Sequence, residues 1–259
     1  MKTIKTSHFG MRHLVLALSV LACAAPAMQA QAASSWMGGE HVQGNNAIQK
    51  QAREVGHFSG LSMGLPGNVE LRIGSTEAVS IETDGNLLPL IETVVENGTL
   101  KIRATKKNLS LEPHVLKIIV QAKDMDRLAL GGSGSIESDA LRGAKLQFDL
   151  GGSGSINVKG IDGESVAVTV GGSGNLKAGS GSTKSLSVSI GGSGDVNLGQ
   201  LKSVEASVSV AGSGQATIAV RDTLSVTIAG SGDVNYYGDP KVSKTVVGSG
   251  GAKRLGGAR

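Results

Sequence analysis

The sequence repeats a glycine-rich word of four residues, and words of this kind hold ions or phosphates in other proteins. It reads GGSG from residues 131, 151, 171 and 191, AGSG from 211 and 229, and VGSG from 247. Calcium-binding β-rolls use G-G-x-G-x-D-x-U-x, but the place of that aspartate holds Ile136, Ile156, Leu176 or Val196. A phosphate loop needs a helix after its glycines, whereas a strand pattern follows here. We therefore expect no metal and no cofactor.

Catalytic residue types are sparse elsewhere. After residue 32 the histidines are His41, His57 and His114, none of which lies in the repeats. Every word contains a serine, so no single serine stands out as a nucleophile. Cleavage of a polysaccharide requires a pair of neighbouring carboxylates. The candidates do not occupy matching places in adjacent repeats, and they are Asp149, Asp162, Glu164, Asp195 and Asp233. We expect no catalytic residues and no enzyme activity, and a β-helical enzyme acting on polysaccharide is the alternative.

The residues around each word alternate between apolar and polar types, which is typical of strands. Before the word stand segments such as SVAVTV and SLSVSI, in which every second residue is apolar. After the word, two columns of equivalent positions are mostly apolar. The first contains Ile136, Ile156, Leu176, Val196, Ala216 and Val234, and the second contains Ser138, Val158, Ala178, Leu198, Ile218 and Tyr236. One repeat cannot bury its apolar face alone, so the pattern predicts stacked coils of a parallel β-helix, each of about 18–20 residues.

The glycines are predicted to form the same sharp corner in every coil, where positive φ angles are required. The turn positions are Gly132, Gly134, Gly152, Gly154, Gly172, Gly174, Gly192, Gly194, Gly212, Gly214, Gly230 and Gly232. The serines of the words, from Ser133 to Ser249, are expected to stack in a column with hydrogen-bonded hydroxyls. We also expect the shortening of the repeat from 20 to 18 residues to fall in the looser corner.

The chain divides into five segments. Residues 1–32 have the order of a secretory signal peptide, with a basic start, a short apolar core and an A-x-A cleavage site. That core is too short for a transmembrane segment, and lipid anchoring at Cys23 is the less favoured alternative. Residues 33–52 are predicted to be a polar leader, 53–126 an N-terminal β-region, 127–252 the repeat solenoid, and 253–259 a basic tail. In the β-region, Asn97-Gly98 indicates a hairpin and Pro89 limits any helix to one turn.

The charge balance excludes one class of partner. The whole chain has 25 basic and 21 acidic residues, but Lys2, Lys5 and Arg12 lie in the signal segment, which leaves 22 against 21. No basic stripe with interleaved aromatic residues is present, so we expect no nucleic-acid binding. Without Cys23 the exported chain has no cysteine, and its own core must hold it together.

Three segments in combination resemble the bacterial GIN-domain family, labelled as autotransporter adhesin heads. They are HFSGL near residue 57, LPGNVEL near 65 and ENGTLKI near 96, and the resemblance extends with the GGSG words from about Arg53 to Tyr237. It implies an exported β-helical domain without established catalytic residues. The last 20 residues cannot form a membrane barrel, which favours the periplasm at least as much as the cell surface.

Our leading hypothesis is an exported, non-catalytic binding or adhesion module that presents a flat polar face. Candidate residues on this face are Thr169, Lys177, Ser187 and Ser189. Its partner would be a protein or glycan of the cell envelope or surface. An envelope structural protein without a specific ligand is a second alternative. Self-association through the ends of the stack is also expected, unless the N-terminal β-region and Lys253, Arg254 and Arg259 block them.

Overall fold

The computed structural model describes residues 39–257, and the predicted signal segment with Cys23 lies outside them. The described part is almost entirely β-structure, with one 3-10 turn, η1, at Leu88–Leu90. The strands of the N-terminal region are β1 (Glu40–Gln43), β2 (Ile48–Arg53), β3 (Gly60–Met63), β4 (Asn68–Ile73), β5 (Ala78–Asp84), β6 (Ile91–Glu96), β7 (Thr99–Ala104), β8 (Leu109–Glu112) and β9 (Leu116–Ala122). Those of the repeats are β10 (Arg127–Gly132), β11 (Ser135–Ser138), β12 (Leu141–Gly152), β13 (Ser155–Val158), β14 (Ile161–Gly172), β15 (Asn175–Ala178), β16 (Gly181–Gly192), β17 (Asp195–Gly212), β18 (Gln215–Gly230), β19 (Asp233–Tyr237), β20 (Lys241–Gly248) and β21 (Gly251–Gly256).

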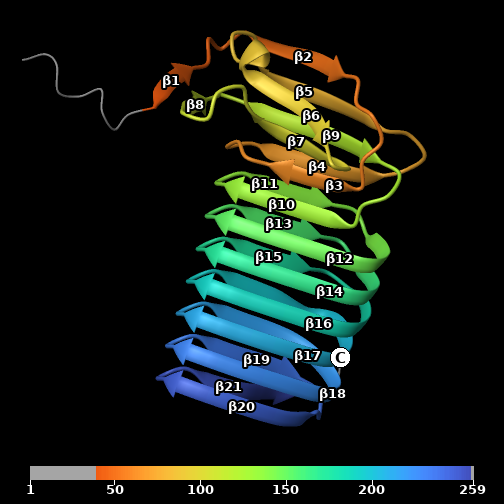
Figure 1. Cartoon of the computed structure of the whole chain (residues 1–259), viewed down its shortest axis with the longest axis vertical. Coiled ribbons are helices and arrows are strands. Elements are labelled where there is room, and N and C mark those ends of the chain that lie inside the picture. Colours follow the sequence, from red (N-terminus) through yellow and green to blue (C-terminus); the bar gives the residue numbers. More distant parts are fainter. Residues whose placement is uncertain (1–38, 258–259) are drawn as a thin grey trace, which may run out of the picture. The chain divides into compact units, whose positions relative to one another are not determined.

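The repeats form a parallel β-solenoid, as the sequence predicts (Figure 1). Each coil contributes a long strand, the glycine corner and a short strand. Long strands β10, β12, β14, β16, β17, β18 and β20 pair in register on one side, which we call the long-strand sheet. Short strands β11, β13 and β15, the first part of β17, the start of β18, and β19 and β21 pair on the other, the short-strand sheet.

The core consists of inward-facing columns shared by all coils. The first predicted column, from Ile136 to Val234, is at most 1% exposed at every position. In the second column, Ser138, Val158, Ala178, Leu198 and Ile218 are buried and Tyr236 is half-buried. Because each coil aligns residue for residue with the next, one continuous apolar core runs along the stack.

The shortening of the repeat falls in the corner that follows the short strand. Leu198 pairs with Ile218 and Glu205 pairs with Thr223, so seven steps along β17 oppose five along β18. The register shifts between these two pairs, and the pairing on both sides is undisturbed. The looser corner therefore absorbs the missing residues, as expected.

The glycines of each word are required for two different reasons. The second glycine has φ between 121° and 144° in all seven words, for example 144° at Gly172. The fourth-position glycine has no positive φ, but a Cβ on Gly174 would lie 2.6 Å from the carbonyl oxygen of Gly154. The first position is open, since a Cβ on Gly171 would meet nothing within 4 Å. This explains why alanine and valine replace that first glycine in the last three words.

The serine column differs from the prediction. The backbone N–H of Ser173 donates to the carbonyl of Gly152 at 2.9 Å, and equivalent bonds continue up to Ser249. The serine hydroxyls of the words are exposed and have no hydrogen-bond partner within residues 39–257. The backbone itself therefore connects successive corners.

The N-terminal region both starts the solenoid and closes it. β3 and β4 pair in parallel with β10 and β11 and so form a first coil. On their other side β3 and β4 pair in parallel with β7 and β9, and beyond these the pairing becomes antiparallel, in β5–β9, β2–β5 and the β6–β7 hairpin. The hairpin turns at Asn97 and Gly98, with φ of 51° and 73°, as the sequence indicates. The described part of the predicted polar leader contains β1, paired with β8, and most of β2.

The C-terminal end is the open end of the stack. β20 pairs only with β18, and β21 pairs only with β19, among the described residues. The start of the predicted basic tail, Lys253 and Arg254, is thus part of the last strand.

Candidate functional site

The outward positions of the long-strand sheet form a regular array of hydroxyl groups. Two columns of serine and threonine run through successive coils, and together we call them the hydroxyl face. The columns are Thr169, Ser189, Ser209, Thr227 and Thr245, and Ser187, Ser207, Ser225 and Ser243. They lie on the outside because their neighbours Val168, Val188 and Ile190 point into the core, and side chains alternate along a strand. Neighbouring strands of a sheet are about 4.8 Å apart, so the hydroxyl pairs repeat at about that interval.

All nine side chains of the hydroxyl face are exposed, and none has a hydrogen-bond partner within residues 39–257. Inward-facing hydroxyls behave differently. Thr183 is buried and donates to the carbonyls of Glu164 and Ser185, and Ser203 donates to the carbonyl of Ala219 at 2.7 Å. The hydroxyl face therefore offers donors and acceptors that no other part of the fold uses.

A shallow groove of ≈340 Å³ runs beside this array towards the C-terminal end. Its walls are formed by the column from Ser187 to Ser243 and by Ser185, Glu205, Thr223 and Lys241. The groove thus combines hydroxyl groups with one carboxylate and one ammonium group. Such a surface suits a polar, elongated ligand that lies along the solenoid axis.

The structure separates the four residues that the sequence assigns to one face. Thr169, Ser187 and Ser189 belong to the hydroxyl face. Lys177 lies on β15 in the short-strand sheet, in register with Asn157 and Asn197. The glycine corner between residues 169 and 177 turns the chain from one sheet to the other.

The candidate carboxylates are spread over both sheets, and Asp162 on β14 accepts hydrogen bonds from the N–H and the hydroxyl group of Ser182. Asp149 lies on the long-strand sheet and binds Arg127 at 2.8 Å. Glu164, at the start of β14, accepts a hydrogen bond from Lys184, which lowers the pKa of its carboxyl group. Asp195 and Asp233 lie on the short-strand sheet, and the carboxylate of Asp233 accepts a bond from the N–H of Gly251. A general acid needs a raised pKa, and every shifted carboxyl group among the described residues is shifted downward.

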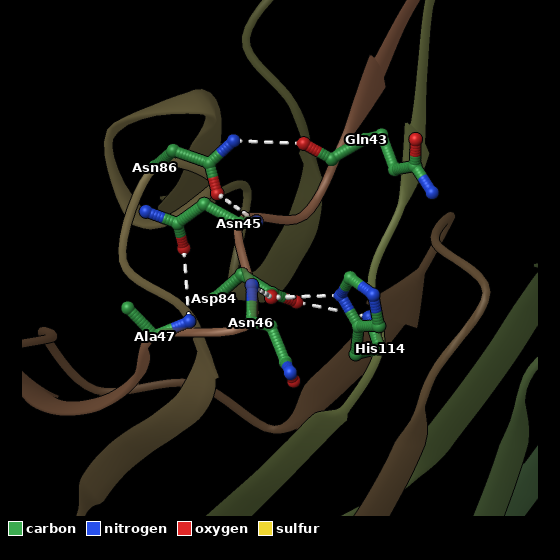
Figure 2. A network of polar contacts seen from close by, with 7 residues as sticks. All are labelled: Gln43, Asn45, Asn46, Ala47, Asp84, Asn86 and His114. Atoms are coloured by element: carbon green, nitrogen blue, oxygen red, sulfur yellow. Dashed lines mark hydrogen bonds and ion pairs between the residues drawn. The ribbon is translucent and has the colours of Figure 1, made fainter.

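The most extensive polar network surrounds Asp84, which is fully buried at the end of β5 (Figure 2). Its carboxylate accepts hydrogen bonds from the backbone N–H of Asn46 at 2.6 Å and of His114 at 2.9 Å. It also contacts Nδ1 of His114 at 3.0 Å. Burial raises the pKa of Asp84, but the bonds from His114 and Asn46 outweigh it, so the pKa lies below its ordinary value.

The Asp84 network fixes the chain between β1 and β2. Asn86 donates to the carbonyl of Gln43 and accepts from the N–H of Asn45, and Asn45 accepts from the N–H of Ala47 (Figure 2). Gly44 lies so close to the carboxylate of Asp84 that a Cβ there would overlap it. Sequence reasoning missed this cluster, because its long-range bonds join residues 30 to 43 positions apart.

The histidines do not complete a nucleophilic site. His41, His57 and His114 each place Nδ1 within 3.0 Å of a carboxylate, on Glu112, Glu77 and Asp84 respectively. His114 borders a groove of ≈690 Å³ that Ser133 and Ser135 also line. The hydroxyl of Ser135 donates to Asn68 at 2.8 Å, and no hydroxyl in the described part of the chain bonds a histidine ring.

No group of three or more His, Cys, Asp or Glu side chains is placed to hold a metal ion between residues 39 and 257. In the same range no helix is long and apolar enough to cross a membrane.

Stacked parallel coils with polar outer faces define this chain as a β-solenoid of the β-helix class. Over residues 57–240 it matches the family described as "Putative auto-transporter adhesin, head GIN domain", and it belongs to that family. No match was found among curated proteins.

Solved structures share the fold at low sequence identity. A putative adhesin from Bacteroides fragilis NCTC 9343 has a TM-score of 0.77 and 20% identity, covering 83% of this chain and 100% of its own. A putative lipid binding protein from Parabacteroides distasonis ATCC 8503 has a TM-score of 0.70 and 24% identity, with the same coverage. A putative adhesin from Parabacteroides merdae ATCC 43184 has a TM-score of 0.67 and 19% identity, covering 84% of this chain and 100% of its own. These likenesses establish the solenoid fold.

Proposed function

We propose that the protein is an exported, non-catalytic binding module that holds an elongated protein or glycan ligand of the cell envelope on its hydroxyl face. The observation that carries this proposal is the in-register array of nine exposed hydroxyls without partners in the described part of the chain. Membership of the adhesin-head family and the names of two structural neighbours agree with a binding role.

The physical basis is repetition rather than a single deep pocket. Each hydroxyl contributes only a weak contact, because a hydrogen bond to a ligand replaces one to water. A ligand with its own repeat along the axis makes many such contacts at once, and their effect then multiplies. The flat sheet keeps the hydroxyls in place, so little conformational freedom is lost on binding.

The direct test compares two charge-altered variants, one for each sheet. T169E/S187E/S189E places three carboxylates on the hydroxyl face, and N157E/K177E/N197E places three on the short-strand sheet as a control. Purified proteins are applied to an array of bacterial envelope and host glycans and to immobilised envelope protein extracts. We expect the first variant to lose binding by at least about tenfold, which is roughly 1.4 kcal/mol, and the control to retain it. Equal binding by wild type and the first variant would refute the assignment of this face.

Export is tested separately on intact cells that carry a C-terminally tagged copy. Protease is added outside the cells, with a periplasmic protein as an internal control. Loss of the tag with the control intact indicates surface exposure, whereas protection until the outer membrane is permeabilised indicates the periplasm. Retention of the tag in the cytoplasm after fractionation would contradict the exported location.

A further inference from the structure

The last coil of the solenoid has cations at two inward positions that are apolar in most other coils. Lys244, in the middle of β20, pairs in register with Val226 of β18. The column that leads to it lies wholly in the core and is at most 2% exposed at each position. Its members are Leu128, Phe148, Val168, Val188, Val208 and Val226.

A second cation occupies the equivalent place on the other sheet. Arg254 in β21 pairs in register with Tyr236, which continues the column from Ser138 through Val158 and Ile218. Nε of Arg254 donates to the carbonyl of Gly238 at 2.6 Å, and a terminal nitrogen lies 3.5 Å from Asp239. The guanidinium group thus stays at the end of the core, half exposed.

Apart from these two residues, the last coil is suited to receive another strand. β20 and β21 have no partner on their outer edges among the described residues, so their unpaired backbone groups face solvent. Large apolar side chains are exposed here, with Val242 37%, Leu255 42% and Val247 70% accessible. An open edge with apolar side chains is a template for pairing with a further chain.

We propose that the shape of the C-terminal end would let a second copy of this chain stack on it, and that Lys244 and Arg254 prevent this stacking and keep the chain monomeric. If two C-terminal ends met, the core column of the long-strand sheet would bring Lys244 into an apolar interior close to the cations of the second copy. A buried charge without a counter-ion is strongly unfavourable, and like charges repel. Inward-pointing charges are one known means of protecting an open sheet edge.

The geometry also predicts which complex forms when the cations are removed. At the N-terminal end η1 and β8 contribute Leu88, Leu109 and Leu111 to the buried core, so additional chain covers part of the core there. We therefore expect two copies to join through their C-terminal ends, where the regular coils continue to the last strand. Such a contact uses the same surface on both chains and closes with two-fold symmetry, giving a dimer rather than a fibre.

The test uses K244V, which continues the valine column, alone and with R254L. Sedimentation equilibrium over the micromolar range measures self-association of the signal-free chain. We expect a monomeric wild type, and a dimer dissociation constant lowered by roughly tenfold or more in K244V and further in K244V/R254L. The matched control is K241V/K253V, which removes two cations and adds two valines on outward positions of the same strands.

Four outcomes decide the proposal. Dimers of K244V with a monomeric control support it, and K244V alone suffices if R254L perturbs the fold. If K244V and K244V/R254L stay monomeric while circular dichroism shows the native strand content, the proposal is wrong. If the K241V/K253V control associates equally, the inward position is irrelevant and the proposal is also wrong. A wild type that already forms dimers through β20 would overturn it as well.

Discussion

The two ends of the solenoid limit exposure of the apolar core in different ways. At the N-terminal end the repeat breaks down: strands become antiparallel, η1 and β8 place leucines on the core, and a buried carboxylate fixes the chain between β1 and β2. At the C-terminal end the repeat continues to its last coil, and only the inward residues change, from valine to Lys244 and from tyrosine to Arg254. One end covers its apolar surface with additional chain, whereas the other makes that surface polar. The first solution needs many long-range contacts, and the second needs only two substitutions within a repeated pattern.

Removal of the last coil gives the sharpest contrast between the ends. Deletion of residues 239–259 leaves Leu224, Val226 and Ile228 of β18 facing inward at an open end without cations. We expect the truncated chain to aggregate, because an apolar edge is then exposed. Size-exclusion chromatography with light scattering measures this, and a chain shortened by residues 257–259 is the control. A monomeric, folded truncated chain would show that the inward charges are unnecessary.

A substitution in the glycine word tests whether the close approach of neighbouring backbones requires glycine at this position. G172A places a Cβ against the backbone of Gly152 and forces alanine to a φ of 144°. We expect the free energy of unfolding to fall by about 2–4 kcal/mol, the sum of backbone strain and overpacking. G171A is the matched control, since its Cβ meets nothing within 4 Å, and it should stay within about 0.5 kcal/mol. Urea denaturation measures the free energy of unfolding of both variants. Equal losses in G172A and G171A would show that the two glycine positions do not differ in their need for glycine.

Asp84 makes the stability of the N-terminal end dependent on pH. Its pKa is lower in the folded chain than in the unfolded chain, so the unfolded state binds a proton first as the pH falls. The carboxylate therefore stabilises the fold at neutral pH, and this contribution disappears on acidification below about pH 4. D84N should melt below the wild type at pH 7 and approach it near pH 2.5.

Hydrogen exchange locates the effect of D84N within the chain. Faster exchange in residues 39–53 with unchanged exchange in β14 and β16 would show that Asp84 stabilises the N-terminal end and not the regular coils. A constant difference in melting temperature across the acid range would instead contradict the role of the charge.

The smallest expected effect concerns Thr83, whose buried hydroxyl has no hydrogen-bond partner among residues 39–257. T83V replaces this hydroxyl with a methyl group of similar shape, which removes an unsatisfied polar atom. We expect a gain of about 1 kcal/mol in the free energy of unfolding, measured in urea at neutral pH. T93V, on half-buried β6, is the comparison and should gain less. A loss of stability in T83V would indicate that the hydroxyl contributes to the N-terminal closure.

The repeated part of the fold was predictable because each of its features occurs several times. The column from Ile136 to Val234 and the corner glycines recur at a fixed spacing, so a single local rule describes every coil. The N-terminal closure has no such repetition. Asp84 is distant in sequence from Asn46 and His114 and meets them only in the folded chain. No local pattern in the polar residues of β1 and β2 indicates which strands they pair with. Lys177 was assigned to the wrong sheet because alternation within strands does not show how far a glycine corner turns the chain.

The in-register alignment of the coils has a consequence for how such a chain can change its length. Because Ser187 of one coil stands where Ser207 stands in the next, an internal coil can be duplicated or lost as a unit of 18 to 20 residues. Both specialised ends stay intact, and the hydroxyl face grows or shrinks by about 4.8 Å for each coil. An insertion of half a coil would instead place polar residues in the core. Selection on ligand length can thus act through whole-coil duplication, a genetic step that leaves every existing contact of the two ends unchanged.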